Sequence, residues 1–187
     1  DAAKIGTQKV IKDHSTLGIV VLSDGTINDF TVSDYLDAEK RVLQEMSELN
    51  KPYVIVLNSS MPNGEKAKLR KEELFNQYGV PVIPINVKSM TSEEASLILK
   101  EALYQFPVTG IELSLPTWVN SLDDEHYIKL SLKETIRLAM DQVKIVRDVN
   151  EITEVIKTNE YVKECSLKNV DTGTGICLVQ IDVIDNL

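Results

Sequence analysis

Three short apolar runs constrain the fold of this chain more than any other feature. They lie at residues 17–22, 53–57 and 80–85, and a stretch with helical spacing separates each run from the next. None of the runs alternates apolar and polar residues, which is typical of strands that are buried on both faces. Strands that alternate with helices in this way form a parallel sheet. The first half of the chain is therefore predicted to be α/β, with helices covering both faces of a parallel sheet.

The predicted helices are indicated by apolar residues spaced three or four positions apart. Residues 2–13 have this pattern, and so do residues 65–78 and 92–104. Another helix is predicted to begin with Asp34 as its cap, and its apolar stripe consists of Tyr35, Ala38, Val42, Met46 and Leu49. The stripe of helix 92–104 consists of Ala95, Ile98, Ala102 and Phe106. Each stripe is expected to pack on the sheet.

The pattern changes after residue 107, where we place a domain boundary. Residues 111–115 alternate weakly, and helices are predicted over 123–145 and 148–159. Two strands then surround the turn Asp171-Thr172-Gly173, and the second carries alternating apolar residues, Cys177, Val179, Ile181 and Val183. We therefore expect residues 1–107 to form one α/β domain. Residues 108–187 are expected to form a smaller α+β domain with a long helix and an antiparallel hairpin.

The long helix carries its own apolar stripe, which consists of Ile128, Leu132, Ile136, Met140 and Val143. This stripe is expected to pack on the hairpin and make the second domain a cooperative unit. If Ile136 is fully buried there, its replacement by Ala is predicted to cost about 2 to 5 kcal/mol.

Charge and composition argue against several classes of protein. The chain has 20 Lys and Arg against 29 Asp and Glu, a formal net charge of −9, and no basic block. This balance argues against an electrostatic grip on nucleic acid or on an anionic membrane. No transmembrane segment is expected, because the apolar runs are far shorter than the roughly 18 residues that a spanning helix needs. The basic residues Lys66, Lys68, Arg70 and Lys71 alternate with glutamates and predict an exposed helix face.

Cysteine and histidine are too few for a disulfide framework or a metal cluster. The chain has two of each, Cys165 and Cys177, and His14 and His126. We interpret the thiols as small core side chains that could face each other across the hairpin, and the histidines as solvated or capping residues. The cysteine usage favours a reducing compartment.

No phosphate-binding or nucleophile motif is present. The sequence lacks G-x-x-x-x-G-K-[ST], G-x-G-x-x-G and G-x-S-x-G. Gly173-Thr174-Gly175 lies at the hairpin turn without a third glycine or a following helix, and turn chemistry explains it. The motifs therefore indicate no catalytic residue and no metal ligand.

Polar turns follow all three predicted strands. Asp24-Gly25-Thr26 follows the first strand, residues 58–63 follow the second, and Asn86-Val87-Lys88 follows the third. The carboxyl ends of parallel strands lie at one edge of the sheet, where open sheets bind ligands. Structural turns would use the same residue types, so a ligand site and a purely structural edge both remain open.

Several blocks of the sequence resemble one family. In order along nearly the whole chain they are DAAKIGTQKVIKDHSTLGIVVLSDGTI, NKPYVIVLNSSMPN, GVPVIPINV, LPTWVNSLDDEHYIK and VRDVN. These blocks resemble the stage IV sporulation protein A family of endospore-forming bacteria. Its members resemble a diverged GTPase-class P-loop domain that hydrolyses ATP, followed by a middle domain and a C-terminal domain. They polymerise on the outer forespore membrane as the base layer of the spore coat.

The resemblance implies that this chain is a central fragment that begins after the phosphate-binding loop. Residues 1–107 would be the C-terminal half of a P-loop NTPase-like parallel sheet, and residues 108–187 would belong to the middle domain. ATP and magnesium are the expected cofactors of the intact protein. None is expected bound to this fragment, which would hydrolyse neither ATP nor GTP.

The resemblance also implies partners and a location. The expected partners are further copies of the intact protein, other spore coat proteins and a small membrane-bound anchor peptide, with no nucleic acid. The expected location is the cytoplasm of the mother cell, at the surface of the forespore outer membrane and in the spore coat.

Finally, the resemblance implies where a nucleotide base would lie. Asn58-Ser59-Ser60-Met61 lies where a GTPase has N-K-x-D, and Asn86-Val87 lies near its second base loop. Ser59 replaces the lysine and Met61 replaces the guanine-reading aspartate, so no preference for guanine is expected. Asn58 is expected to tie loops together.

Three alternatives to this site remain open. In the first, residues 58–63 are only a tight connection between a strand and a helix. In the second, the chain is a nucleotide-independent scaffold that binds coat partners. A small-molecule enzyme is the third, which the sequence favours least because it has no visible nucleophile, acid–base pair or metal set.

Overall fold

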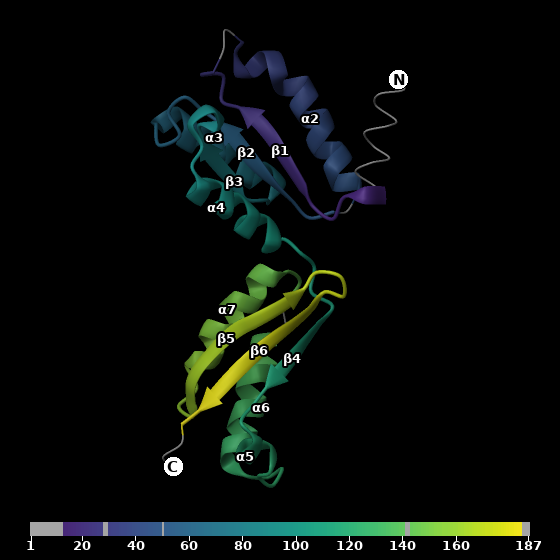
Figure 1. The fold of residues 1–187 in the computed structure, drawn as a ribbon, viewed down its shortest axis with the longest axis vertical. Helices are drawn as coiled ribbons and strands as arrows, with labels where there is room; N and C mark the ends of the chain where they lie inside the picture. Colours follow the sequence, from purple (N-terminus) through teal and green to yellow (C-terminus); the bar gives the residue numbers. More distant parts are fainter. Residues whose placement is uncertain (1–12, 28–29, 50, 141–142, 185–187) are drawn as a thin grey trace. The chain divides into compact units, whose positions relative to one another are not determined.

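The computed structural model describes residues 13–27, 30–49, 51–140 and 143–184. It divides the chain into two compact units, Asp1–Gln105 and Phe106–Leu187, and Figure 1 shows the elements of each. The helix predicted over residues 2–13 lies outside the described residues except for its last position.

The first unit is a parallel sheet with helices packed against it. Its strands are β1 (Gly18–Ser23), β2 (Tyr53–Asn58) and β3 (Val82–Ile85), which lie in the order β1-β2-β3 with both pairs parallel. Its helices are α2 (Val32–Glu48), α3 (Glu65–Tyr78), the 3-10 turn η1 (Val87–Ser89) and α4 (Ser92–Leu103). The predicted α/β class and the parallel sheet are confirmed.

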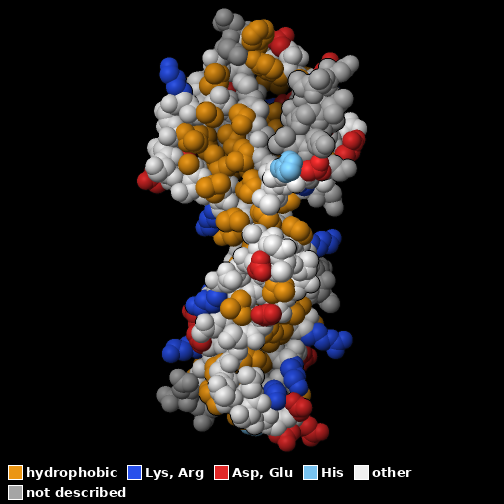
Figure 2. Space-filling model, turned by 45° about the vertical axis from the view of Figure 1, so that its right-hand side comes forward, with side chains coloured by type: hydrophobic (Ala, Val, Ile, Leu, Met, Phe, Trp, Pro, Cys, Tyr) orange, Lys and Arg blue, Asp and Glu red, His pale blue; other side chains and the backbone are white. Residues whose placement is uncertain are grey.

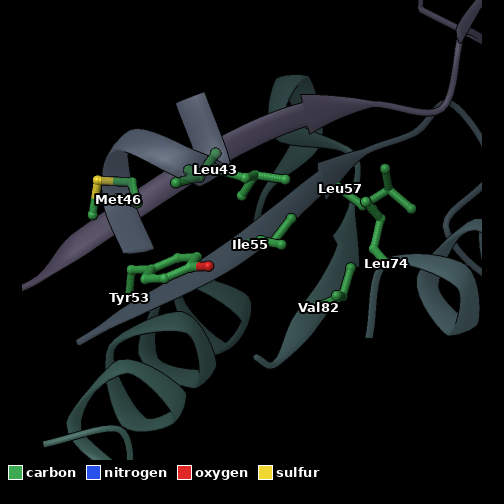
Figure 3. Close-up of a cluster of buried hydrophobic side chains, with 8 residues drawn as sticks. Leu43, Met46, Tyr53, Ile55, Leu57, Leu74 and Val82 are labelled. Atoms are coloured by element: carbon green, nitrogen blue, oxygen red, sulfur yellow. The ribbon is translucent and has the colours of Figure 1, made fainter. Parts of the chain in front are cut away.

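Helices cover both faces of this sheet. On one face, side chains of α2 and α3 pack on the strands in a cluster of Val20, Leu43, Met46, Tyr53, Ile55, Leu57, Leu74 and Val82 (Figure 3). On the other face, α4 contributes Ile98 and Ala102 to a second cluster. The strands contribute Val54, Val56, Ile83 and Ile85 to it. Alternate residues of a strand point to opposite faces, so β2 contributes to both clusters and is buried from Tyr53 to Leu57. This double burial explains why the run lacks polar alternation.

Helix α2 begins one turn earlier than predicted. Its N-cap is Thr31, whose backbone N–H donates to Oδ2 of Asp34 at 2.7 Å. Asp34 therefore completes a capping box from the third helical position and is not itself the cap. The hydroxyl of Thr31 also donates to this carboxylate at 2.8 Å, and these hydrogen bonds lower the pKa of Asp34.

The apolar stripe predicted for α2 is only partly the buried one. Glu39 and Leu43, which are not in the predicted stripe, are buried, whereas Val42 is 38% exposed. Tyr35, Ala38 and Val42 line a groove along β1 instead of joining the core. A spacing of three or four residues fits two adjacent faces of a helix, and local periodicity does not reveal which face the sheet covers.

Arg70 corrects the prediction of an exposed basic face on α3. Its side chain is 7% exposed and forms an ion pair with Glu39 of α2, whose side chain is 5% exposed, and with Glu73 at 2.7 Å. Burial lowers the pKa of Arg70, but the hydrogen bonds to Glu73 and Glu39 outweigh burial and raise it. Arg70 lies on the buried side of α3 with Ala67, a position that the alternation of charges did not reveal.

The second unit is a smaller α+β module, as predicted. Its strands are β4 (Gly110–Ser114), β5 (Val162–Asp171) and β6 (Ile176–Val183), in the order β4-β6-β5. Strands β5 and β6 form the expected antiparallel hairpin, and β4 pairs with β6 in parallel. Its helices are α5 (Thr117–Asn120), α6 (Tyr127–Met140) and α7 (Val146–Lys157).

Helix α6 buries only part of its predicted stripe. Ile128 and Leu132 are buried, but Ile136 is only half-buried. The cost predicted for replacing Ile136 by Ala assumed that this side chain is fully buried, so that prediction does not apply. Nδ1 of His126 accepts a hydrogen bond from the backbone N–H of Ile128 at 3.3 Å, which confirms its interpretation as a capping residue.

Both cysteines are free and buried, which confirms their interpretation as core thiols. They do not face each other, however, because Cys165 pairs in register with Ile181 and Cys177 pairs with Val170. The register of a hairpin depends on bulges as well as on alternation, and β5 has two register shifts that the sequence pattern did not predict.

Candidate functional site

Hydrogen bonds join the three loops that follow the parallel strands into one edge. The backbone N–H of Ser60 donates to Oγ1 of Thr26 at 2.9 Å, which links the loops after β1 and β2. The backbone N–H of Val87 donates to Oδ1 of Asn58 at 3.1 Å, which links the loops after β2 and β3. The structure thus brings together all three polar turns that the sequence singled out.

Asn58 ties loops together, as predicted. Its side-chain oxygen accepts a hydrogen bond from the backbone N–H of Val87. Its backbone oxygen accepts one from the N–H of Asp24 at 3.3 Å. Asn58 is the last residue of the central strand, so it can reach both neighbouring loops. The side chain of Asn86 acts more locally, because its Oδ1 accepts from the backbone N–H of Lys88 at 3.1 Å.

Ser59 is used inside the loop and does not present its side chain at the surface. It is 0% exposed, and its hydroxyl accepts from the backbone N–H of Met61 at 3.0 Å. Its own N–H donates to the backbone oxygen of Ile85 at 3.0 Å. Among the proposed base-side residues, Ser59 therefore shapes the loop that carries its neighbours.

Among the proposed base-side residues, the exposed ones are Ser60, Met61 and Val87. Met61 is 68% exposed and Val87 is 42% exposed. Both offer apolar contact area, and the thioether of Met61 is only a weak hydrogen-bond acceptor. A flat ring could contact these two side chains and hydrogen-bond to the hydroxyl of Ser60 or to backbone groups. None of these three side chains can supply a charged acceptor.

Thr26 and Asp24 are members of this edge that the predicted site omitted. Oδ1 of Asp24 accepts from the hydroxyl of Thr26 at 2.5 Å and from its backbone N–H at 3.0 Å. The carboxylate is 1% exposed, and no donor from the described part of the chain reaches its other oxygen, Oδ2. The signal in the sequence was the Asp-Gly-Thr turn directly after a strand, although it did not show that Thr26 reaches a second loop.

The described residues contain neither a metal-ligand group nor a membrane-spanning helix. Within them, no group of three or more His, Cys, Asp or Glu side chains could hold a metal ion. Over the same ranges, no helix combines the length and the apolar character needed to cross a membrane.

Two family models together match the whole chain. The model described as the stage IV sporulation protein A ATPase domain matches residues 1–107, and the model for the middle domain of the same protein matches residues 108–187. The chain belongs to the stage IV sporulation protein A family. This membership confirms the resemblance found in the sequence blocks.

Relatives in this family are considerably longer than the chain. Proteins named stage IV sporulation protein A from Bacillus subtilis (strain 168), Clostridioides difficile (strain 630) and Bacillus anthracis are 35%, 38% and 34% identical to it, respectively, over its whole length. The chain spans 38% of the length of each. Their names indicate a role in sporulation. No solved structure matches the chain significantly.

Proposed function

We propose that the longer stage IV sporulation protein A to which this sequence corresponds is an ATPase, and that residues 1–107 supply the base side of its nucleotide domain. The observation that carries this proposal is the joined edge, where Thr26 and Asn58 tie three strand-end loops together. Ligands bind open parallel sheets at such an edge. The matching of residues 1–107 by an ATPase-domain model supports the proposal, as the second half of a P-loop NTPase-like sheet would carry this edge.

The chemistry of the loop after β2 favours adenine over a specific reading of guanine. Guanine presents N1–H and an amino group as donors, and an aspartate would accept both in charge-assisted bonds. Met61 offers only a weak acceptor at the corresponding position. Two unpaired buried donors would cost guanine on the order of 1 to 3 kcal/mol each. Adenine has one amino group and an unprotonated N1, which Ser60 or backbone groups can serve.

ATP and magnesium are the cofactors proposed for the longer protein. Bound ATP would supply the phosphoryl group for hydrolysis, while the loops described here would hold and orient its base. The exposed apolar side chains of Met61 and Val87 fit a base. The described residues form no metal-ligand group, and the sequence has no phosphate-binding motif. This chain alone is therefore expected to hydrolyse neither ATP nor GTP.

The biological role proposed for the longer protein is assembly of the spore coat. In this role it would polymerise with other copies of itself as a base layer at the forespore outer membrane. Its partners would be coat proteins and a small membrane-bound anchor peptide, and it would act in the cytoplasm of the mother cell. Family membership supports a role in sporulation, and the assembly itself is our proposal.

A nucleotide-independent scaffold is the second candidate. The compact second unit, Phe106–Leu187, has its own sheet and helices and could bind a partner without any nucleotide. The two candidates differ in whether the loops after β2 and β3 contact a base.

Photolabelling with 8-azido-ATP tests the proposed base site. We expect the longer protein to be labelled in peptides that contain residues 58–63 or 86–90, and unlabelled ATP should displace the label. The variant Leu69→Lys, on the exposed face of α3, is the control and should be labelled like the wild type. Labelling confined to other peptides would contradict the base site. An absence of saturable labelling would favour the scaffold.

A further inference from the structure

The turn that follows β3 uses its backbone amides inside the fold. Val87 donates its N–H to Oδ1 of Asn58 at 3.1 Å. Lys88 and Ser89 both donate to Asn86, the first to its side-chain oxygen and the second to its backbone oxygen, each at 3.1 Å. A ligand that approaches this turn therefore meets carbonyl oxygens, while the N–H groups are already committed.

Residues 59–62, which follow β2, use their amides in the same way. Ser60 donates its N–H to the hydroxyl of Thr26 at 2.9 Å, and Met61 donates to the hydroxyl of Ser59 at 3.0 Å. Ser59 donates to a backbone oxygen at the end of β3, also at 3.0 Å. The next residue is a proline, which has no N–H. Both turns of the candidate site are thus poor in backbone donors.

Apolar contact alone cannot select one base at this edge. Figure 2 shows hydrophobic side chains gathered over one face of the first unit, so exposed apolar area is common on this unit. The exposed side chains of Met61 and Val87 could contact any purine ring. Hydrogen-bonding groups must therefore supply the choice between purines.

The proposed base site implies which part of a purine would meet which turn. In that site, Met61 would face N1 and position 2 of the ring, as the guanine-reading carboxylate of a GTPase does. Position 6 is next to N1 on the ring, and Val87 lies in the neighbouring base loop. A substituent at position 6 would therefore face the turn that follows β3. Adenine carries an amino group at position 6, whereas guanine and hypoxanthine carry an oxygen there.

We propose that this edge selects 6-aminopurine nucleotides because the side-chain oxygen of Asn58 occupies the backbone N–H of Val87, the donor that a 6-oxo group would need. This selectivity rests on the proposed function, since it requires the base site. A 6-amino group can donate to carbonyl oxygens, which have two lone pairs each. A buried 6-oxo group without a donor is costly. Asn58 is then a positioning residue that acts through Val87, independently of Met61.

Exposed side chains are the other donors of the turn that follows β3. Lys88 and Ser89 are both exposed, so each would give up water and side-chain freedom to reach a base. The backbone amide of Val87 is fixed by the fold and would lose neither. Its hydrogen bond to Asn58 therefore matters more for selectivity than the mobile donors nearby.

Binding of three purine nucleotides to the longer protein tests the proposal. ATP has a 6-amino group, purine riboside triphosphate has only hydrogen at position 6, and inosine triphosphate (ITP) has a 6-oxo group but no 2-amino group. Purine riboside triphosphate should bind roughly two- to tenfold more weakly than ATP, because it loses one neutral hydrogen bond. ITP should bind at least about tenfold more weakly than ATP. Binding of either analogue as tightly as ATP would overturn the proposal.

Variants of Asn58 separate position 6 from the contribution of Met61. Asn58→Ala frees the N–H of Val87 and leaves Met61 in place, so ITP should gain at least about fivefold relative to ATP. Asn58→Asp retains a side-chain oxygen for Val87 and should keep the wild-type ratio. An unchanged ratio in Asn58→Ala, in protein that circular dichroism shows to be folded, would overturn the proposal. If Asn58→Ala does not fold, the wild-type nucleotide series decides.

Other results would count against the proposed function itself. If the longer protein binds none of the three nucleotides, or if 8-azido-ATP labels only other peptides, the base site is wrong and the selectivity falls with it. If ATP binds and the label lies in residues 58–63 or 86–90, but ITP binds equally well, the base site stands and the role of Asn58 in selectivity is wrong.

Discussion

Thr26 and Ser60 join two loops that lie 34 residues apart in the sequence, through a hydrogen bond of 2.9 Å from the backbone N–H of Ser60 to Oγ1 of Thr26. The same hydroxyl donates to Oδ1 of Asp24 at 2.5 Å. The hydroxyl of Thr26 thus accepts a hydrogen bond from the loop after β2 and donates one to Asp24 in its own loop. The position of Ser60 and Met61 at the edge of the sheet consequently depends on a residue outside their own loop.

Replacing Thr26 by Val should destabilise the first unit. The change keeps the shape of the side chain but removes the acceptor for Ser60 and a donor to the buried carboxylate of Asp24. Asp24 is 1% exposed, and loss of a partner by a buried polar group costs about 1 to 3 kcal/mol. Urea unfolding of this chain would measure the loss. The matched control Thr26→Ser retains the hydroxyl and should recover most of the stability, whereas equal losses in both variants would show that the methyl group matters instead.

Leu132 and Ile136 should differ in how much they stabilise the second unit. Leu132 is 2% exposed, so we expect Leu132→Ala to cost about 2 to 5 kcal/mol. Ile136 is only half-buried, so Ile136→Ala should destabilise the unit clearly less. Denaturant unfolding of both variants checks the order. A larger cost at Ile136 would mean that the covered face of α6 is wrongly assigned.

Cys165 should be an unreactive thiol in the folded protein. Burial raises its pKa to about 11, and burial raises the pKa of Cys177 as well. We expect a thiol reagent at pH 8 to modify both cysteines slowly in the native chain and rapidly in urea, because the thiolate is the reactive form. Rapid native labelling of both would contradict their burial.

The raised pKa of Cys165 also predicts the direction of a pH effect on stability. The thiol of an unfolded chain ionises near pH 8.5, below the folded value of about 11. The unfolded state therefore loses its proton first, and stability should fall as the pH rises from about 8.5 towards 11. Cys165→Ala should reduce this slope relative to the wild type. An unchanged slope would assign the pH dependence to other groups.

Local patterns were sufficient wherever an element depends on its own residues. Helix α3 spans Glu65–Tyr78 as predicted, and Gly79, at a φ of +68°, ends it in a left-handed conformation that suits glycine. The central strand was recognised because both of its faces are buried, which leaves no polar residue from Tyr53 to Leu57. Such signals lie within a few residues of each other.

The predictions from sequence are wrong or incomplete where the burial or position of a residue depends on a partner far away in the sequence. Glu39 and Arg70 lie 31 residues apart, and their pairing puts two charged residues between α2 and α3 where local patterns indicated solvent. The link from Thr26 to Ser60 is equally invisible in either loop alone. The sequence therefore located the candidate edge through its strand ends, while the hydrogen bonds that shape it emerged only from the fold.

Competition binding of ATP and GTP to the longer protein tests the central claim most directly. In the proposed base site, Met61 takes the position where the carboxylate of a GTPase would read guanine, so we expect GTP to displace bound ATP no better than ATP itself does. Met61→Asp should shift the preference towards guanine, while the control Met61→Leu should leave the ratio unchanged. A tenfold preference of the wild type for GTP would contradict the proposed loss of the guanine reader.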